Sequence, residues 1–216
     1  MLRPFSGIFI IELISLTLLK RAELLAKCAD IIAAVSFEAL HGNKKALFHK
    51  VHEVRNHEGQ IESATTIRGL ISSIETPSDF DDKHFPTIKV QDSYSLRCTP
   101  QVHGIVHDTI RFVKSILEKE FNCATDNPLV FTGETPYGDQ DPAIPGFTIS
   151  GGNFHGEYPA KVLDYLAIAI HEISSISERR IERFMNPELN SKIYPAFLVK
   201  KGGILNYFEN FLISIR

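Results

Sequence analysis

The sequence predicts an all-α protein, and three observations support that prediction. Three long segments carry apolar residues at every third or fourth position, which is the spacing of one face of a helix. No segment shows the sustained alternation of apolar and polar residues that marks a half-buried strand. Residues 127–152 hold four prolines and five glycines, so this interval forms neither a continuous helix nor a central strand.

The first helix is predicted to end at about Leu40, because His-Gly-Asn at 41–43 supplies a stop signal. The stretch 7–19, GIFIIELISLTLL, is apolar enough to resemble the core of a signal peptide. Glu12 interrupts it, no small-residue cleavage site follows, and it is shorter than the roughly 20 residues of a membrane span. We therefore interpret it as a buried helix start rather than a signal or an anchor. The apolar stripe of this helix is Leu18, Ala22, Leu25, Ala29 and Ile32.

Three further helices are expected along the chain. A short one follows Gly59, and residues 75–89 after it combine two prolines with three aspartates, which predicts an exposed loop. A long helix should cover about 100–121, with Pro100 in the first turn, where its missing N–H costs nothing. The last helix should end near Met185, before Pro187.

Composition limits the classes of function. With 216 residues and 44% hydrophobic content, the chain is long enough for one domain with a proper core. Lys plus Arg (23) and Asp plus Glu (26) are scattered and give a net charge of −3, so we expect no nucleic acid and no membrane as a partner. Three cysteines without a CxxC spacing argue against a disulfide framework and predict a reducing, cytoplasmic compartment.

The most informative polar cluster is QDSYSLRC at residues 91–98. Tyr94 and Arg97 are three residues apart, so on a helical turn their side chains lie on one side. Arginine presents a rigid fork that fits a carboxylate, and a neighbouring tyrosine donates a hydrogen bond or, with a lowered pKa, takes a proton. The pair therefore suits an amino-acid-like substrate. The alternative is structural: Arg97 pairs with Asp92 or a helix end, and the Tyr94 ring packs in the core.

Two more clusters flank the turn-rich interval. ISGGNFHGE at 149–157 offers an amide, an aromatic ring, an imidazole and a carboxylate, and its paired glycines let backbone N–H groups approach a ligand. It contains no phosphate-loop pattern, and the two glycines also fit the first turn of the next helix. TDNPLV at 125–130 places Asp126 and Asn127 before a proline, as ordinary turns do.

Two histidines, His103 and His107, have the i, i+4 spacing of a metal-binding pair on a helix. The glutamate of HExxH is missing, and no third ligand occurs at a known spacing. We therefore expect no metal, and a partly buried, hydrogen-bonded histidine pair instead. SERRIERF at 177–184 is most simply a charged helix face.

These motifs occur together in the order of a known family. QDSYSLRCTPQVHG, TDNPLVF and ISGGNFHGE, followed by LAIAIHEISSISERR and FLVKKGG, closely resemble histidine ammonia-lyase, a branch of the aromatic amino acid ammonia-lyases. The resemblance covers about residues 20–205 and includes LLAKCADIIAAVSFEALHG upstream. It implies the long-helix bundle of the ammonia-lyase and fumarase type, a homotetramer, and the conversion of L-histidine to trans-urocanate and ammonia.

The resemblance also implies roles for individual residues. Arg97 matches the arginine that binds the substrate carboxylate, and Tyr94 matches the catalytic tyrosine beside the substrate. Gln91, Asn127 and Phe154 match residues around the same pocket. The family's electrophile is methylidene-imidazolone, which forms autocatalytically from an internal Ala-Ser-Gly.

The sequence departs from the family pattern at both ends. No Ala-Ser-Gly occurs in the 216 residues, and residues 1–19 and 206–216 look unrelated to the family. We therefore predict the central portion of a truncated ammonia-lyase at 20–205, inactive as an isolated chain because its electrophile does not form. L-histidine is the expected ligand, and another copy or a full-length homologue is the expected protein partner. The alternative is a non-catalytic helical subunit that associates with full-length ammonia-lyase.

Overall fold

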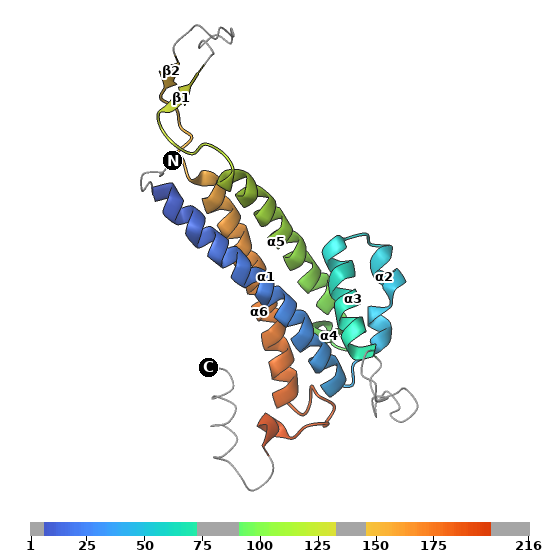
Figure 1. Ribbon diagram of the computed structural model, residues 1–216. Coiled ribbons are helices and arrows are strands. Elements are labelled where there is room, and N and C mark those ends of the chain that lie inside the picture. The colour runs from blue at the N-terminus through green and yellow to red at the C-terminus, as the bar shows by residue number, and fades with distance from the viewer. Residues whose placement is uncertain (1–6, 73–90, 133–145, 200–216) are drawn as a thin grey trace. The chain divides into compact units, whose positions relative to one another are not determined.

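The computed structural model describes residues 7–72, 91–132 and 146–199 (Figure 1). The predicted all-α class is confirmed, and the expected helix ends near Leu40, Phe121 and Met185 lie within one residue of the observed ends. The loop expected at 75–89 lies outside the described residues. The helices are α1 (Gly7–Ala39), α2 (His49–Glu53), α3 (Glu58–Ser72), α4 (Tyr94–Arg97), α5 (Thr99–Phe121) and α6 (Glu157–Met185). The other elements are the 3-10 turns η1 (Lys44–Leu47) and η2 (Ala196–Leu198) and the strands β1 (Leu129–Phe131) and β2 (Phe147–Ile149).

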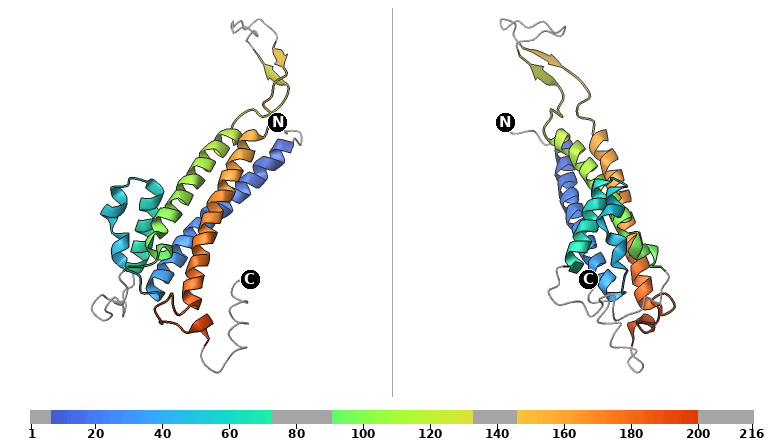
Figure 2. Two further views of the ribbon diagram at one scale, coloured as in Figure 1. Left: turned by 180° about the vertical axis from the view of Figure 1, so that it is seen from behind. Right: turned by 90° about the vertical axis from the view of Figure 1, so that its right-hand side faces the viewer.

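The chain divides into two compact units. The first consists of residues 1–23 and 109–168, and the second of residues 24–108 and 169–216. Helices α1, α5 and α6 each contribute one part to each unit. Within the second unit, α2 and α3 lie side by side in every view (Figures 1 and 2).

The core of the second unit gathers apolar side chains from α1, η1, α3 and α4. Each of them is at most 5% exposed, and burying such surface stabilises the fold by about 25 cal/mol per Å². The Tyr194 hydroxyl donates to the carbonyl of Ala39 at 2.8 Å, which ties the segment after α6 to the end of α1. The core residues are Ala33, Ala34, Phe37, Leu40, Leu47, Ile67, Ile71 and Leu96.

Helices α3 and α5 approach each other at two glycines. A Cβ on Gly59 would collide with the carbonyl oxygen of Gly104, and a Cβ on Gly104 would lie 2.5 Å from the backbone nitrogen of Gln60. Asp108 of α5 accepts a hydrogen bond from the Gly59 N–H at 3.0 Å, which satisfies one of the unpaired donors in the first turn of α3. The contact therefore requires glycine for close approach and the aspartate for capping.

The first unit contains the only strands among the described residues. Leu129 pairs with Ile149 and Phe131 with Phe147 in antiparallel register, and the two phenylalanine rings stack with centroids 5.4 Å apart. Each strand has three residues, so it is too short for alternation to show in the sequence. This hairpin occupies the turn-rich interval for which we expected neither a helix nor a central strand.

The start of α1 is helical as predicted, but its side chains are not buried as predicted. Ile10, Leu13 and Ile14 are 49%, 59% and 52% exposed, whereas Glu12 and Ser15 are 7% and 0% exposed. The Ser15 hydroxyl can be buried because it donates to the Ile11 carbonyl at 2.7 Å. Ile10, Leu13 and Ile14 therefore face outward, whereas Leu19 at the end of the stretch is buried, at 2% exposure. Among the described residues, no helix is long and apolar enough to cross a membrane.

The glycine contact yields a matched pair of substitutions. We expect Gly104→Ala to lower the free energy of unfolding by about 2 kcal/mol, because the new methyl group overpacks against α3. A Cβ on Gly69, inside α3, would meet nothing within 4 Å, so Gly69→Ala should raise stability by about 0.5 to 1 kcal/mol through helix propensity. Urea denaturation followed by circular dichroism measures both. Equal changes in the free energy of unfolding for Gly104→Ala and Gly69→Ala would contradict the close contact between α3 and α5.

Candidate functional site

The QDSYSLRC motif forms the short helix α4 and its junction with α5. The Arg97 N–H donates to the Ser93 carbonyl at 2.8 Å, and the Cys98 N–H donates to the Tyr94 carbonyl at 2.9 Å. Cys98 ends α4, and α5 begins at Thr99, whose hydroxyl donates to the Ser95 carbonyl at 3.0 Å. The motif is therefore a fixed helical turn at the head of a long helix.

Tyr94 and Arg97 lie together on this turn, as their spacing predicts. The Arg97 guanidinium carbon is 5.1 Å from the centre of the Tyr94 ring, and the ring is 71% exposed. Among the described residues, no hydrogen bond or ion pair engages the Arg97 side chain. The Asp92 carboxylate instead accepts the backbone N–H of Asn43. The structural alternative, with a core tyrosine and an Asp92–Arg97 pair, is therefore wrong.

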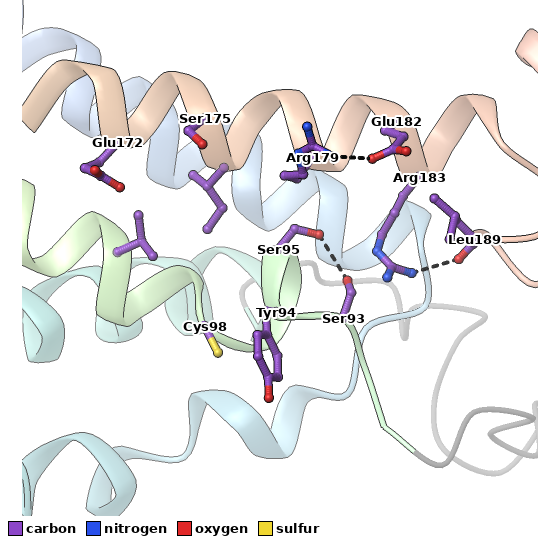
Figure 3. A pocket seen from close by; sticks show the side chains of 12 residues that line it. Ser93, Tyr94, Ser95, Cys98, Glu172, Ser175, Arg179, Glu182, Arg183 and Leu189 are labelled. Atoms are coloured by element: carbon purple, nitrogen blue, oxygen red, sulfur yellow. Dashed lines mark hydrogen bonds and ion pairs between the residues drawn. The ribbon is translucent and has the colours of Figure 1, made fainter.

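A pocket of about 440 Å³ lies between the α4–α5 junction and the second half of α6 (Figure 3). Its lining includes Tyr94, but not Arg97. Figure 3 shows the Tyr94 ring directed away from α6, so the ring and the α6 side chains of the pocket face different ways. On the α6 side, Arg179 pairs with Glu182 at 3.0 Å, and Arg183 donates to the Leu189 carbonyl at 2.8 Å.

Asn127 holds a turn in the first unit. Its side-chain oxygen accepts the Gly151 N–H at 2.7 Å and the Ser150 hydroxyl at 3.2 Å. The side-chain amide of Asn153 donates a further hydrogen bond to the Ala124 carbonyl at 3.2 Å. Asn127 also precedes the cis peptide bond to Pro128.

The two remaining predicted ligands are accessible side chains. Phe154 is 51% exposed and follows the turn that Asn127 holds. Gln91 is exposed and lies three residues before Tyr94. Gln91, Tyr94 and Arg97 thus belong to the second unit, whereas Asn127 and Phe154 belong to the first.

A dense polar cluster among the described residues centres on Asp30, which no sequence motif singled out. The buried Asp30 carboxylate of α1 accepts hydrogen bonds from Ser63 of α3 at 2.6 Å and from His103 and His107 of α5 at 2.8 Å each. Arg180 of α6 reaches the far side of His103 at 3.4 Å. The sequence could have indicated this cluster through Asp30, which lies beside the stripe of alanines on α1, because a charge buried there needs hydrogen-bonding partners.

The expected histidine pair is confirmed, whereas the expected charged face needs correction. His103 and His107 are hydrogen-bonded and buried, at 1% and 8% exposure, and Asp30 is their shared partner. Arg180 lies in the segment that we interpreted as a charged face, yet it is 2% exposed. No group of three or more His, Cys, Asp or Glu residues in the described ranges has the arrangement of a metal site.

Charge and burial fix the proton positions in this cluster. Arginine only donates, so Nε2 of His103 accepts from Arg180 and Nδ1 carries the proton that Asp30 accepts. Burial lowers the pKa of His103, the bond to Asp30 opposes that effect, and the nearby charge of Arg180 adds to it. Burial alone raises the pKa of Asp30, but the hydrogen bonds from His103, His107 and Ser63 outweigh it and hold the pKa well below its ordinary value. Burial lowers the pKa of Arg180 to about 10.

The fold and the site together define a class of protein. The described residues form an all-α protein in which an exposed tyrosine and a half-buried arginine lie together, a pair whose chemistry suits a carboxylate ligand. The structure resembles histidine ammonia-lyase from Trypanosoma cruzi, with a TM-score of 0.74 and 43% identity over 94% of this chain and 34% of that chain. It also resembles tyrosine aminomutase from Streptomyces globisporus, with a TM-score of 0.75 and 29% identity over 94% of this chain and 39% of that chain.

The family model of aromatic amino acid lyases matches residues 7–211. The chain therefore belongs to the aromatic amino acid lyase family. It is 52% identical over 189 residues to histidine ammonia-lyase of Bos taurus and 53% identical over 190 residues to that of Mus musculus. Both alignments cover 88% of this chain, which spans 27% of the length of these relatives. The resemblance to histidine ammonia-lyase is thus confirmed.

The Asp30 cluster predicts a specific loss of stability in acid. Folding lowers the pKa of His103 from 6.5 and that of Asp30 from 3.8, so in acid the unfolded chain binds more protons than the folded chain. The contribution of His103 is complete above pH 6.5 and that of Asp30 above pH 3.8, and each is lost as the pH falls further. We expect Asp30→Asn to lower the free energy of unfolding at neutral pH by about 3 kcal/mol and to flatten its decline below pH 3.8.

The measurement is urea denaturation between neutral and acidic pH. Asp164→Asn serves as the control, because Asp164 is an exposed residue of α6. The cluster would lose its assigned role if the two variants had the same stability and the same pH dependence.

Proposed function

We propose that this protein carries the carboxylate-binding portion of a histidine ammonia-lyase, with Arg97 as the residue that holds L-histidine. One observation carries the proposal: the Arg97 guanidinium stacks on Tyr94 and pairs with no carboxylate among the described residues. Such a guanidinium has its parallel N–H donors available for the two oxygens of a substrate carboxylate. The reaction that the family resemblance implies is elimination of ammonia from L-histidine to give trans-urocanate, in histidine catabolism.

The other predicted site residues receive roles that fit their contacts. The exposed Tyr94 phenol is the group we assign to proton transfer at the substrate. The Asn127 oxygen is occupied by Gly151 and Ser150, so its N–H donors are the end that remains for a ligand. We assign an apolar contact to Phe154 and an amide contact to Gln91.

The elimination itself needs more than these residues. In the family, methylidene-imidazolone supplies the electrophile that turns the amine into a leaving group. The 216 residues contain no Ala-Ser-Gly from which it forms, and the described side chains offer no equivalent electrophile. We therefore assign substrate binding to this chain and no elimination by the chain alone. A reducing, cytoplasmic setting fits its free thiols at Cys28, Cys98 and Cys123.

Binding of L-histidine to the full chain tests the role of Arg97. We expect saturable binding by isothermal titration calorimetry, and Arg97→Gln should weaken it about tenfold or more, because a charge-assisted hydrogen bond is lost. Arg21→Gln removes the same charge from an exposed position of α1 and should leave binding unchanged. Histamine, which lacks the carboxylate, should bind the unmodified chain and Arg97→Gln equally.

The same samples test for catalysis through the ultraviolet absorbance of urocanate. We expect no urocanate from the chain alone. Urocanate formation would contradict the assignment of binding without chemistry, whereas loss of histidine binding in Arg21→Gln but not in Arg97→Gln would refute the site itself.

A second candidate function is a non-catalytic subunit that associates with a full-length ammonia-lyase. The outward face of α1 in the second unit favours it, because Leu24, Ile31 and Val35 are 63%, 49% and 64% exposed at spacings of seven and four residues. An apolar stripe of this kind is typical of a face that packs against another helix.

Size-exclusion chromatography with light scattering measures association of the chain with itself and with a full-length enzyme. We expect the chain alone to self-associate, and we expect it to co-elute with full-length histidine ammonia-lyase of Mus musculus when the two are mixed. Val35→Asp should reduce both, because it places a charge in the centre of the contact. A chain that stays monomeric and does not bind the full-length enzyme would argue against this second function.

A further inference from the structure

A separate surface on η1 and α2 combines exposed apolar and basic side chains. Phe48, Val51 and Val54 are 49%, 48% and 84% exposed. They are three residues apart, and the Val51 N–H donates to the Phe48 carbonyl at 3.0 Å, so the three side chains follow one side of a helical turn. Large apolar side chains gathered on a surface mark interaction sites. We call these residues, together with Lys45, Lys50 and Arg55, the basic patch.

Buried residues on the inner side hold the basic patch in shape. Leu47 and His52 are each 1% exposed. The His52 ring donates from Nε2 to the Ala46 carbonyl at 3.0 Å and accepts at Nδ1 from the Gln60 side chain at 2.9 Å. Since these contacts fix the orientation of the turn, Phe48 and Val51 cannot turn inward without breaking them. The fold therefore keeps the apolar side chains of Phe48 and Val51 facing outward.

The charge of this segment is opposite to that of the rest of the chain. Residues 41–57 hold four Lys or Arg and one Glu, which gives +3, so the net charge of −3 leaves −6 for the remainder. Lys44 is already paired with Glu38 at 3.2 Å. Lys45 and Lys50 have no side-chain ion pair with any described residue. The basic patch thus keeps cationic groups around an apolar centre.

We propose that the basic patch binds an acidic protein segment that carries an apolar side chain. Opposite charges would steer the segment to the patch, and the apolar side chain would cover Phe48 and Val51. A nucleic acid or an anionic membrane fits less well, because the remainder of the chain is acidic and the patch holds fewer cations than such polyanions require. The inference does not depend on the proposed lyase function.

Fluorescence anisotropy with the full chain tests this proposal. The probe is a labelled peptide rich in Asp and Glu with a central Leu-Phe pair, and its counterpart has Asn and Gln at the acidic positions. We expect the acidic peptide to bind about tenfold more tightly than its counterpart at low salt, with most of the difference lost at high salt. This comparison uses the unmodified chain, so it does not depend on how any variant folds.

Variants then locate the site. Lys45→Glu combined with Lys50→Glu should weaken binding of the acidic peptide about tenfold, and Val51→Ser combined with Val54→Ser should weaken binding of both peptides. Lys27→Glu makes one such charge reversal on an exposed residue of α1 and should have little effect. Equal binding of the two peptides, tighter binding of duplex DNA or anionic vesicles, or an effect of Lys27→Glu as large as that of the patch variants would each overturn the proposal.

Discussion

The second unit depends on one buried carboxylate. Asp30 of α1 accepts from Ser63 of α3 and from two histidines of α5, and Arg180 of α6 reaches the same cluster through His103. Burying a carboxylate costs several kcal/mol unless donors surround it, and here three donors do. The cluster therefore ties together four helices by directional hydrogen bonds, which add to their apolar contacts and to the bond between Gly59 and Asp108.

This arrangement determines where the candidate site lies. His103 is four residues after the start of α5, and the next residue, Gly104, packs against α3. The first turns of α5 are thus held from two sides, and only Cys98 separates α5 from the end of α4 at Arg97. The exposed Tyr94 and the half-buried Arg97 lie on a turn that cannot shift freely. A site on a rigid turn keeps its geometry without a ligand, which lowers the ordering cost of binding.

The sequence predicts the elements well and their partnerships poorly. The period of the apolar residues and the stop signals after them place the ends of α1, α5 and α6, because both are local properties of the chain. The stripe predicted for α1 is wrong in part, since Leu18, Leu25 and Ile32 are 41%, 42% and 58% exposed. The same period says nothing about contacts over long separations, and Asp30 is 73 residues from His103 and 77 from His107. The start of α1 shows the related failure, since part of an apolar stretch that was expected to be buried is turned outward. Local pattern reports amphipathicity, not which surface is covered.

The candidate site shows the same division between local and distant information. Spacing placed Tyr94 and Arg97 on one side of a turn, and the 5.1 Å stacking distance agrees with it. The exposure of Tyr94 and the hydrogen bond between Asp92 and Asn43 could not be predicted, because they depend on how α4 meets the segment after α1. A guanidinium that holds a carboxylate contacts substrate and transition state alike, so it contributes affinity and little acceleration. The role that we propose for Arg97 is therefore one of binding and not of elimination.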